Sequence, residues 1–114
     1  MHFKILTLFP EMFENYLTSS VLGRGLKKNL WNYELINIRD FSKEKHKKVD
    51  DTPFGGGCGM VINPEVIAST IDATCNLDTT KIYYMSPRGA LFNQKKVNDI
   101  LQNKEVAIIC GRYE

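Results

Sequence analysis

The chain has 114 residues and a mass of 13.1 kDa, which is enough for one domain and too little for two independent cores. Hydrophobic residues make up 43% and charged residues 25%, which excludes a disordered tail, a collagen-like chain and a disulfide-rich scaffold. The net charge of +2 is too small to indicate an acidic partner by itself.

Cysteine spacing and the length of the apolar runs indicate where the protein works. Cys58, Cys75 and Cys110 cannot all pair within one chain, and their spacing matches no zinc pattern, so we expect reduced thiols and no metal site. The sequence has no signal-peptide pattern, and its apolar runs fall short of the roughly 20 residues that span a bilayer. We therefore predict a cytoplasmic protein with no membrane partner.

The first third of the chain predicts a strand, two helices and a second strand. Phe3–Phe9 is a short apolar run closed by Pro10, which is typical of a buried strand. Glu11–Leu17 and Val21–Leu30 are helical in pattern, and the second has apolar residues at helical spacing with basic residues on its other face. Trp31–Ile38 then alternates as a strand does.

Residues 39–59 form the irregular part of the sequence. The segment Lys43–Lys48 contains four lysines, and Gly55–Gly59 contains four glycines. A loop of this length in a compact domain is usually functional or disordered. We expect Lys43–Gly57 to be mobile or poorly ordered when no ligand is bound, because it has high charge, several glycines and few apolar anchors.

The second half of the chain alternates helices and strands. An asparagine N-cap followed by Pro64 predicts a helix that runs to about Cys75. Ile82–Met85 and Val106–Cys110 are predicted strands, with a helix over Asn93–Leu101 between them. This order favours an α/β fold with a parallel sheet flanked by helices, on which the helix after Pro64 packs.

Three unusual loops follow predicted strands or lie just beyond them, namely 39–59, 86–89 and 111–114. In a parallel sheet such loops gather at the carboxyl edge, where ligands bind. The glycines allow close backbone approach to a ligand, but a plain flexible loop has the same composition. The carboxylates of Asp50 and Asp51 can bind a cation or accept hydrogen bonds from the edge of a base. A pair of this kind also occurs in plain solvated turns. The lysines suit phosphate contacts or a solvated face.

Six segments, in order and spread over the whole chain, resemble the bacterial tRNA (guanine-N1)-methyltransferase family, a knotted class often called SPOUT. They are Leu8–Phe13, Arg39–Phe41, Val49–Asp51, Pro53–Met60, Ser86–Gly89 and Cys110–Glu114. The resemblance implies transfer of a methyl group from S-adenosylmethionine to N1 of the guanine at position 37, directly 3′ of the tRNA anticodon. It also implies a homodimer with the active site between subunits, and a cofactor held in a trefoil knot.

The resemblance assigns residues to two ligands. The cofactor-binding residues would be Tyr84, Met85, Ser86, Pro87, Gly111, Tyr113 and Glu114. The tRNA-binding residues would be Asp50, Gly55, Gly56, Gly57, Gly59, Arg24, Lys43, Lys45, Lys47 and Lys48.

The sequence departs from the family pattern in two places. Cys58 stands where the family commonly has Pro or Ala. The sequence also ends at Glu114, before the second cofactor loop and before the Arg and Asp to which the family's guanine activation is credited. We therefore expect residues 1–114 to be the N-terminal part of the methyltransferase domain. They would contain no catalytic base and end before the knot is complete, so that this stretch alone is inactive.

Two other functions remain open on the residues alone. The first is a non-catalytic RNA-binding module that uses the basic loop, and the second is a small nucleotide-binding α/β domain. Cofactor binding distinguishes the methyltransferase from the RNA-binding module. Nucleotide binding without RNA would favour the small nucleotide-binding domain.

Overall fold

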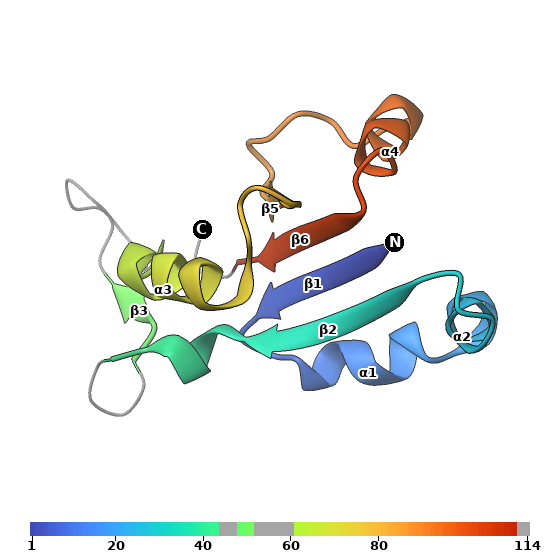
Figure 1. The fold of residues 1–114 in the computed structure, drawn as a ribbon. Coiled ribbons are helices and arrows are strands. Elements are labelled where there is room, and N and C mark those ends of the chain that lie inside the picture. Colours follow the sequence, from blue (N-terminus) through green and yellow to red (C-terminus); the bar gives the residue numbers. More distant parts are fainter. Residues whose placement is uncertain (44–47, 52–60, 112–114) are drawn as a thin grey trace.

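The computed structural model describes residues 1–43, 48–51 and 61–111. Its centre is a four-stranded sheet in the order β2-β1-β6-β5, and each neighbouring pair of strands is parallel (Figure 1). The strands are β1 (His2–Thr7), β2 (Asn32–Asn37), β5 (Thr80–Met85) and β6 (Glu105–Cys110). The predicted parallel α/β class and the parallel pairing of β5 with β6 are therefore confirmed.

The four predicted helices are all present, with small shifts at their ends. They are α1 (Glu11–Leu17), α2 (Ser20–Lys27), α3 (Pro64–Thr74) and α4 (Gln94–Ile100). α2 ends three residues earlier than expected, because Asn29 has a φ of 58°, the left-handed conformation that commonly follows a helix. α3 begins as predicted, since the side chain of Asn63 accepts a hydrogen bond from the backbone N–H of Glu65. None of the helices in the described ranges is long and apolar enough to cross a membrane.

The stretch 39–59 was expected to be irregular, and its described part corrects that expectation. The short 3-10 helix η1 (Ile38–Phe41) follows β2 directly. β3 (Asp50–Asp51) then pairs antiparallel with β4 (Val61–Ile62). These elements depend on contacts with distant residues, which a local sequence pattern does not reveal. The predicted mobility of residues 43–57 falls largely outside the described residues.

The main core lies between α3 and one face of the sheet. Side chains of a strand alternate between the two faces, so Leu6 of β1, Ile36 of β2 and Ile109 of β6 share one face. All three are buried, and they belong to one apolar cluster with Val66 of α3. The prediction that the helix after Pro64 packs on the sheet is therefore confirmed.

The opposite face carries α1 and α2, which are held by aromatic residues of β2 and its start. Trp31 donates its ring N–H to the carbonyl of Leu22 at 3.0 Å, and Tyr33 donates its hydroxyl to Glu14 at 3.3 Å. The apolar pattern of α2 suggests a buried stripe, but the stripe is only partly buried. Val21 is 67% exposed, and Leu30, just beyond the helix, is 69% exposed.

Candidate functional site

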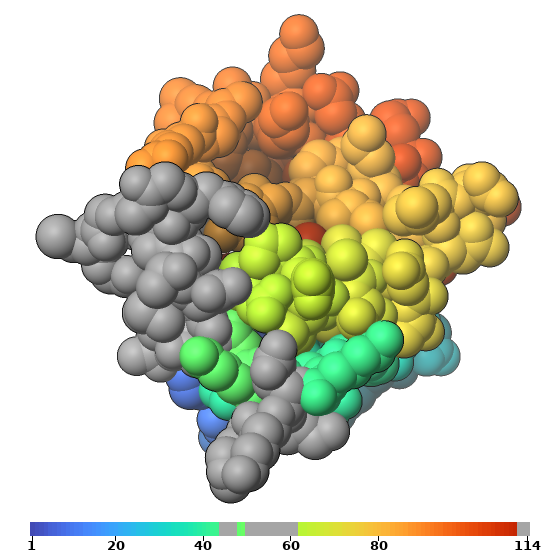
Figure 2. All heavy atoms as spheres, turned by 90° about the vertical axis from the view of Figure 1, so that its left-hand side faces the viewer, coloured from blue at the N-terminus to red at the C-terminus, as the bar shows by residue number. Residues whose placement is uncertain are grey.

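The candidate site is the edge of the sheet where the four parallel strands end. Figure 2 looks onto this edge, with α3 near its centre, the η1 segment below and the residues after β5 above. Ligands of open α/β proteins bind at this edge because the strand ends leave a crevice between the loops.

The ends of β5 and β6 place two of the predicted cofactor segments next to each other. Met85 is paired with Cys110, so Ser86 and Gly111 start from neighbouring positions. The hydroxyl of Ser86 accepts a hydrogen bond from the backbone N–H of Arg88 at 3.1 Å, and its carbonyl accepts one from Gly89 at 3.2 Å. The segment after β5 is therefore a tight turn, as its Ser-Pro-Arg-Gly sequence predicts.

The last two residues of β5 offer apolar surface at this edge. Tyr84 is 50% exposed and Met85 is 51% exposed. Because consecutive strand residues point to opposite faces, these two side chains border the strand end from opposite sides. An exposed aromatic ring beside turn backbone is a surface on which a flat ring system can pack.

The cysteine at the end of β6 has a different electrostatic environment. Burial raises the pKa of the Cys110 thiol above its ordinary value. The thiol is therefore protonated at neutral pH and is a poor nucleophile. Cys110 contributes packing beside Gly111, and none of the described residues lowers the pKa of its thiol.

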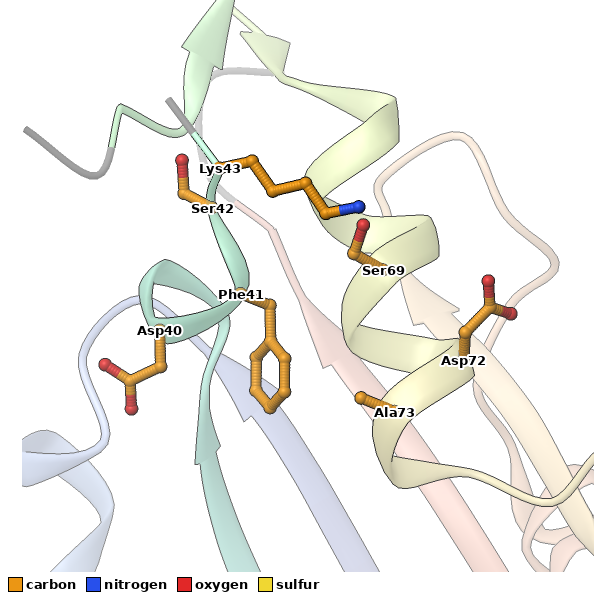
Figure 3. A pocket seen from close by; sticks show the side chains of 7 residues that line it. All are labelled: Asp40, Phe41, Ser42, Lys43, Ser69, Asp72 and Ala73. Atoms are coloured by element: carbon orange, nitrogen blue, oxygen red, sulfur yellow. The ribbon is translucent and has the colours of Figure 1, made fainter. Parts of the chain in front are cut away.

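A groove between η1 and α3 lies on the same side of the molecule and has a volume of about 510 Å³. In Figure 3 the side chain of Lys43 reaches across it towards Ser69, while the carboxylates of Asp40 and Asp72 point away from each other and from the gap. The lining residues are Asp40, Phe41, Ser42, Lys43, Ser69, Asp72 and Ala73. The groove is therefore lined by two apolar side chains, two hydroxyls, two carboxylates and one ammonium group.

Two of the predicted tRNA-binding lysines are held near this groove. Ser42 donates its hydroxyl to the carbonyl of Lys48 at 2.5 Å, which brings the backbone at Lys48 close to Ser42. The next residue, Val49, is buried, and its carbonyl accepts a hydrogen bond from the backbone N–H of Asn63 at 2.6 Å. Both lysines are exposed, so their charges are available to a phosphate.

Arg24 does not lie with these lysines. It is on α2, and the chain leaving α2 enters β2 at Asn32, which pairs with His2 at the start of β1. Arg24 is therefore near the amino ends of the strands, whereas Lys43 follows their carboxyl ends. A strand of six residues separates these two levels by about 20 Å.

Several predicted site residues cannot be placed. Asp50 is described only by its backbone, which pairs with Ile62. The others lie outside the described residues, and they are Lys45, Lys47, Gly55, Gly56, Gly57, Gly59, Tyr113 and Glu114.

The structure adds residues that the sequence analysis did not assign to a site. Ser69 and Asp72 are three residues apart on α3 and line the groove opposite Phe41. Their spacing places them on one helical face, but no sequence signal says that η1 packs against that face. Within the described residues, no cluster of three His, Cys, Asp or Glu side chains is arranged to hold a metal ion.

The parallel sheet has α3 on one face and α1 and α2 on the other. The Ser86 turn and the exposed Lys43 and Lys48 stand at its carboxyl edge. This arrangement is typical of α/β proteins that bind ligands at that edge. Comparison with known proteins makes this specific. The family model described as tRNA (Guanine-1)-methyltransferase TrmD matches residues 1–114, and the chain belongs to this family.

Relatives and a solved structure agree with this assignment. The tRNA (guanine-N(1)-)-methyltransferase of Rickettsia typhi is 48% identical over the whole chain, and that of Wolbachia pipientis is 46% identical over 96% of it. The crystal structure of tRNA (m1G37) methyltransferase from Aquifex aeolicus matches the whole chain with a TM-score of 0.83 and 33% identity. The chain spans about half the length of these proteins, at 49%, 48% and 52% respectively.

Proposed function

We propose that the protein takes part in transfer of a methyl group from S-adenosylmethionine to N1 of the guanine at position 37 of tRNA. The observation that carries the proposal is the side-by-side start of the Ser86 turn and Gly111 at neighbouring strand ends. These strand ends lie at the carboxyl edge of the sheet, where open α/β proteins bind their ligands. The membership of the family gives that position its chemistry.

The cofactor, when bound, supplies a methyl group already activated by a sulfonium. Tyr84, Met85, Ser86 and Pro87 would border the adenosyl group on the β5 side. Gly111 would offer backbone contacts on the β6 side, and Tyr113 and Glu114 would follow it towards the methionine end. The task of these residues is to bind and orient, because positioning two reactants removes much of the entropic part of the barrier.

The tRNA would approach the carboxyl edge from the side of the basic loop. Lys43 and Lys48 are exposed there, and with Lys45 and Lys47 they would contact phosphates. Asp50 and the glycines between 55 and 59 would handle the target guanine and its neighbour. Arg24 lies at the far end of the sheet, so it would contact a separate part of a long RNA or none.

A proton acceptor is needed as well, since N1 of guanine carries a proton at neutral pH. A carboxylate within hydrogen-bond distance can accept that proton as the methyl group arrives, which typically accelerates a reaction about 10²–10⁴-fold. We propose that no residue among the 114 fills this role and that the base comes from the remaining half of the family's length. We also propose that the whole protein is a cytoplasmic homodimer.

The test is transfer of labelled methyl to an unmodified tRNA transcript, with a transcript carrying adenine at position 37 as the matched control. The natural full-length protein should methylate only the guanine transcript. A polypeptide of residues 1–114 should show no measurable turnover. Turnover by that polypeptide within about tenfold of the full-length protein would show that the catalytic residues are misplaced. RNA binding by the full-length protein without methyl transfer would instead favour a non-catalytic module.

A further inference from the structure

A close contact joins Gly111, directly after β6, to Tyr84 of the neighbouring strand β5. A Cβ atom placed on Gly111 would lie only 2.6 Å from the hydroxyl oxygen of Tyr84. It would also lie 3.1 Å and 3.2 Å from two carbon atoms of the same ring. A side chain at position 111 would therefore have to displace the end of the Tyr84 side chain.

The register of the sheet explains the contact. Tyr84 is paired with Ile109, and so it lies two residues before the level of Gly111 on the neighbouring strand. Strand side chains lean along the strand direction, which carries the long tyrosine ring over the position just after β6. Half of Tyr84 remains exposed, so the ring has one side against Gly111 and another side towards solvent.

Gly89, the other described glycine at this edge, has no such constraint. A Cβ atom on Gly89 would meet only the carbonyl oxygen of Ser86, at an ordinary contact distance of 3.5 Å. Gly111 is thus set apart by the ring that covers it. Two explanations for a glycine at 111 are possible, namely close approach of a ligand or close approach of Tyr84, and they predict different behaviour on substitution.

We propose that Tyr84 is a positioning residue whose ring fixes the backbone at Gly111, and that Tyr84 is what requires a glycine there. The inference rests on the proposed function, because the backbone in question is the one that would contact S-adenosylmethionine. Tyr84 would act through Gly111 as well as by bordering the ligand. Any change that lifts the ring should loosen the backbone at Gly111.

The experiment is a double-mutant cycle in the natural full-length protein, with S-adenosylmethionine binding measured by calorimetry and unfolding followed by circular dichroism. Gly111→Ala should weaken binding about tenfold, and Tyr84→Phe, which alters a residue that borders the ligand, is the reference for the double variant. In the double variant the nearest ring atom is a carbon at 3.1 Å instead of an oxygen at 2.6 Å, so adding Gly111→Ala to Tyr84→Phe should weaken binding less than about threefold. Gly89→Ala is the matched control and should leave binding unchanged.

The outcomes separate the alternatives. Recovery in the double variant supports the proposal, and the same coupling should appear in the unfolding midpoints. Additive losses would mean that the methyl group at 111 collides with the ligand, which overturns the proposal but keeps the proposed function. Coupling in unfolding without any change in binding would reduce the contact to a structural one and also overturn it. Absence of binding by the unsubstituted protein would overturn the proposed function together with this inference.

Discussion

The two faces of the sheet are built in different ways. On the face covered by α3, Leu6, Ile109 and Val66 are buried and form one continuous apolar core. On the other face, Trp31 holds α2 and Tyr33 holds α1, each through one hydrogen bond, while Val21 and Met85 remain more than half exposed. The second face also buries Ile5 and Val106, but the larger apolar cluster lies on the first face. The exposed residues of the second face leave apolar surface that further polypeptide or a partner can still bury.

The largest expected effect comes from removing a core side chain on the α3 face. Leu6→Ala should lower the free energy of unfolding by about 2–5 kcal/mol, because it opens a cavity where the leucine is fully buried. The control Leu101→Ala, at a position that is 57% exposed, should change stability by less than about 0.5 kcal/mol. Urea unfolding of both variants measures the difference. Equal losses would show that the two faces do not differ as described.

The corner between α1 and α2 should be the most sensitive point of the other face. A Cβ atom on Gly23 would lie 2.1 Å from the carbonyl oxygen of Thr18, which is backbone and cannot turn away. Gly23→Ala should therefore cost about 1–3 kcal/mol in unfolding experiments. Gly25→Ala should cost less, since its Cβ atom would meet the movable Trp31 side chain at 2.9 Å. The reverse order would contradict a rigid corner.

A partly buried ion pair at the amino end of the α3 face should make stability depend on pH. Lys4 lies 2.8 Å from Glu105 and also donates a hydrogen bond to the carbonyl of Thr74, the last residue of α3. The hydrogen-bonded Glu105 carboxylate raises the pKa of Lys4, and the Lys4 ammonium lowers the pKa of Glu105.

The sign of the effect follows from these directions. The carboxylate's contribution is present above the unfolded pKa of about 4.3 and is lost as pH falls through the lower folded value. The ammonium's contribution is present below about pH 10.4 and is lost as pH rises through the higher folded value. Lys4→Met should remove about 1 kcal/mol at neutral pH and flatten both limbs of a stability–pH curve. A curve identical to that of the unsubstituted protein would rule out this role for the pair.

The smallest expected effect is on the link between α2 and the start of β2. Trp31→Phe keeps the aromatic contacts with Phe3 and Tyr33 but removes the hydrogen bond to the carbonyl of Leu22. The loss should be about 0.5 kcal/mol, because water can reach the freed carbonyl. Thermal unfolding should detect it. A loss as large as that of Leu6→Ala would mean that the second face is as tightly built as the first.

Local patterns were sufficient to predict the four helices, the four strands of the main sheet and the fold class, but not η1, β3 and β4. The Asn63 cap placed α3, and the short apolar runs placed β5 and β6. The alternation of strands and helices was enough to predict a parallel sheet, because a parallel strand needs a crossover connection. These features depend on neighbours in the chain, and so a single sequence contains them.

The site depended on contacts that no local pattern encodes. The register of β5 against β6 brings Tyr84 over Gly111, and the packing of η1 on α3 creates the groove that Lys43 enters. The exposure of Val21 and Met85 was equally hidden, since an apolar stripe looks the same whether or not something covers it. The sequence by itself determined the main helices and strands and the family chemistry that they resemble. Only the tertiary structure decided which side chains meet, because residues far apart in the chain become neighbours through strand order and register.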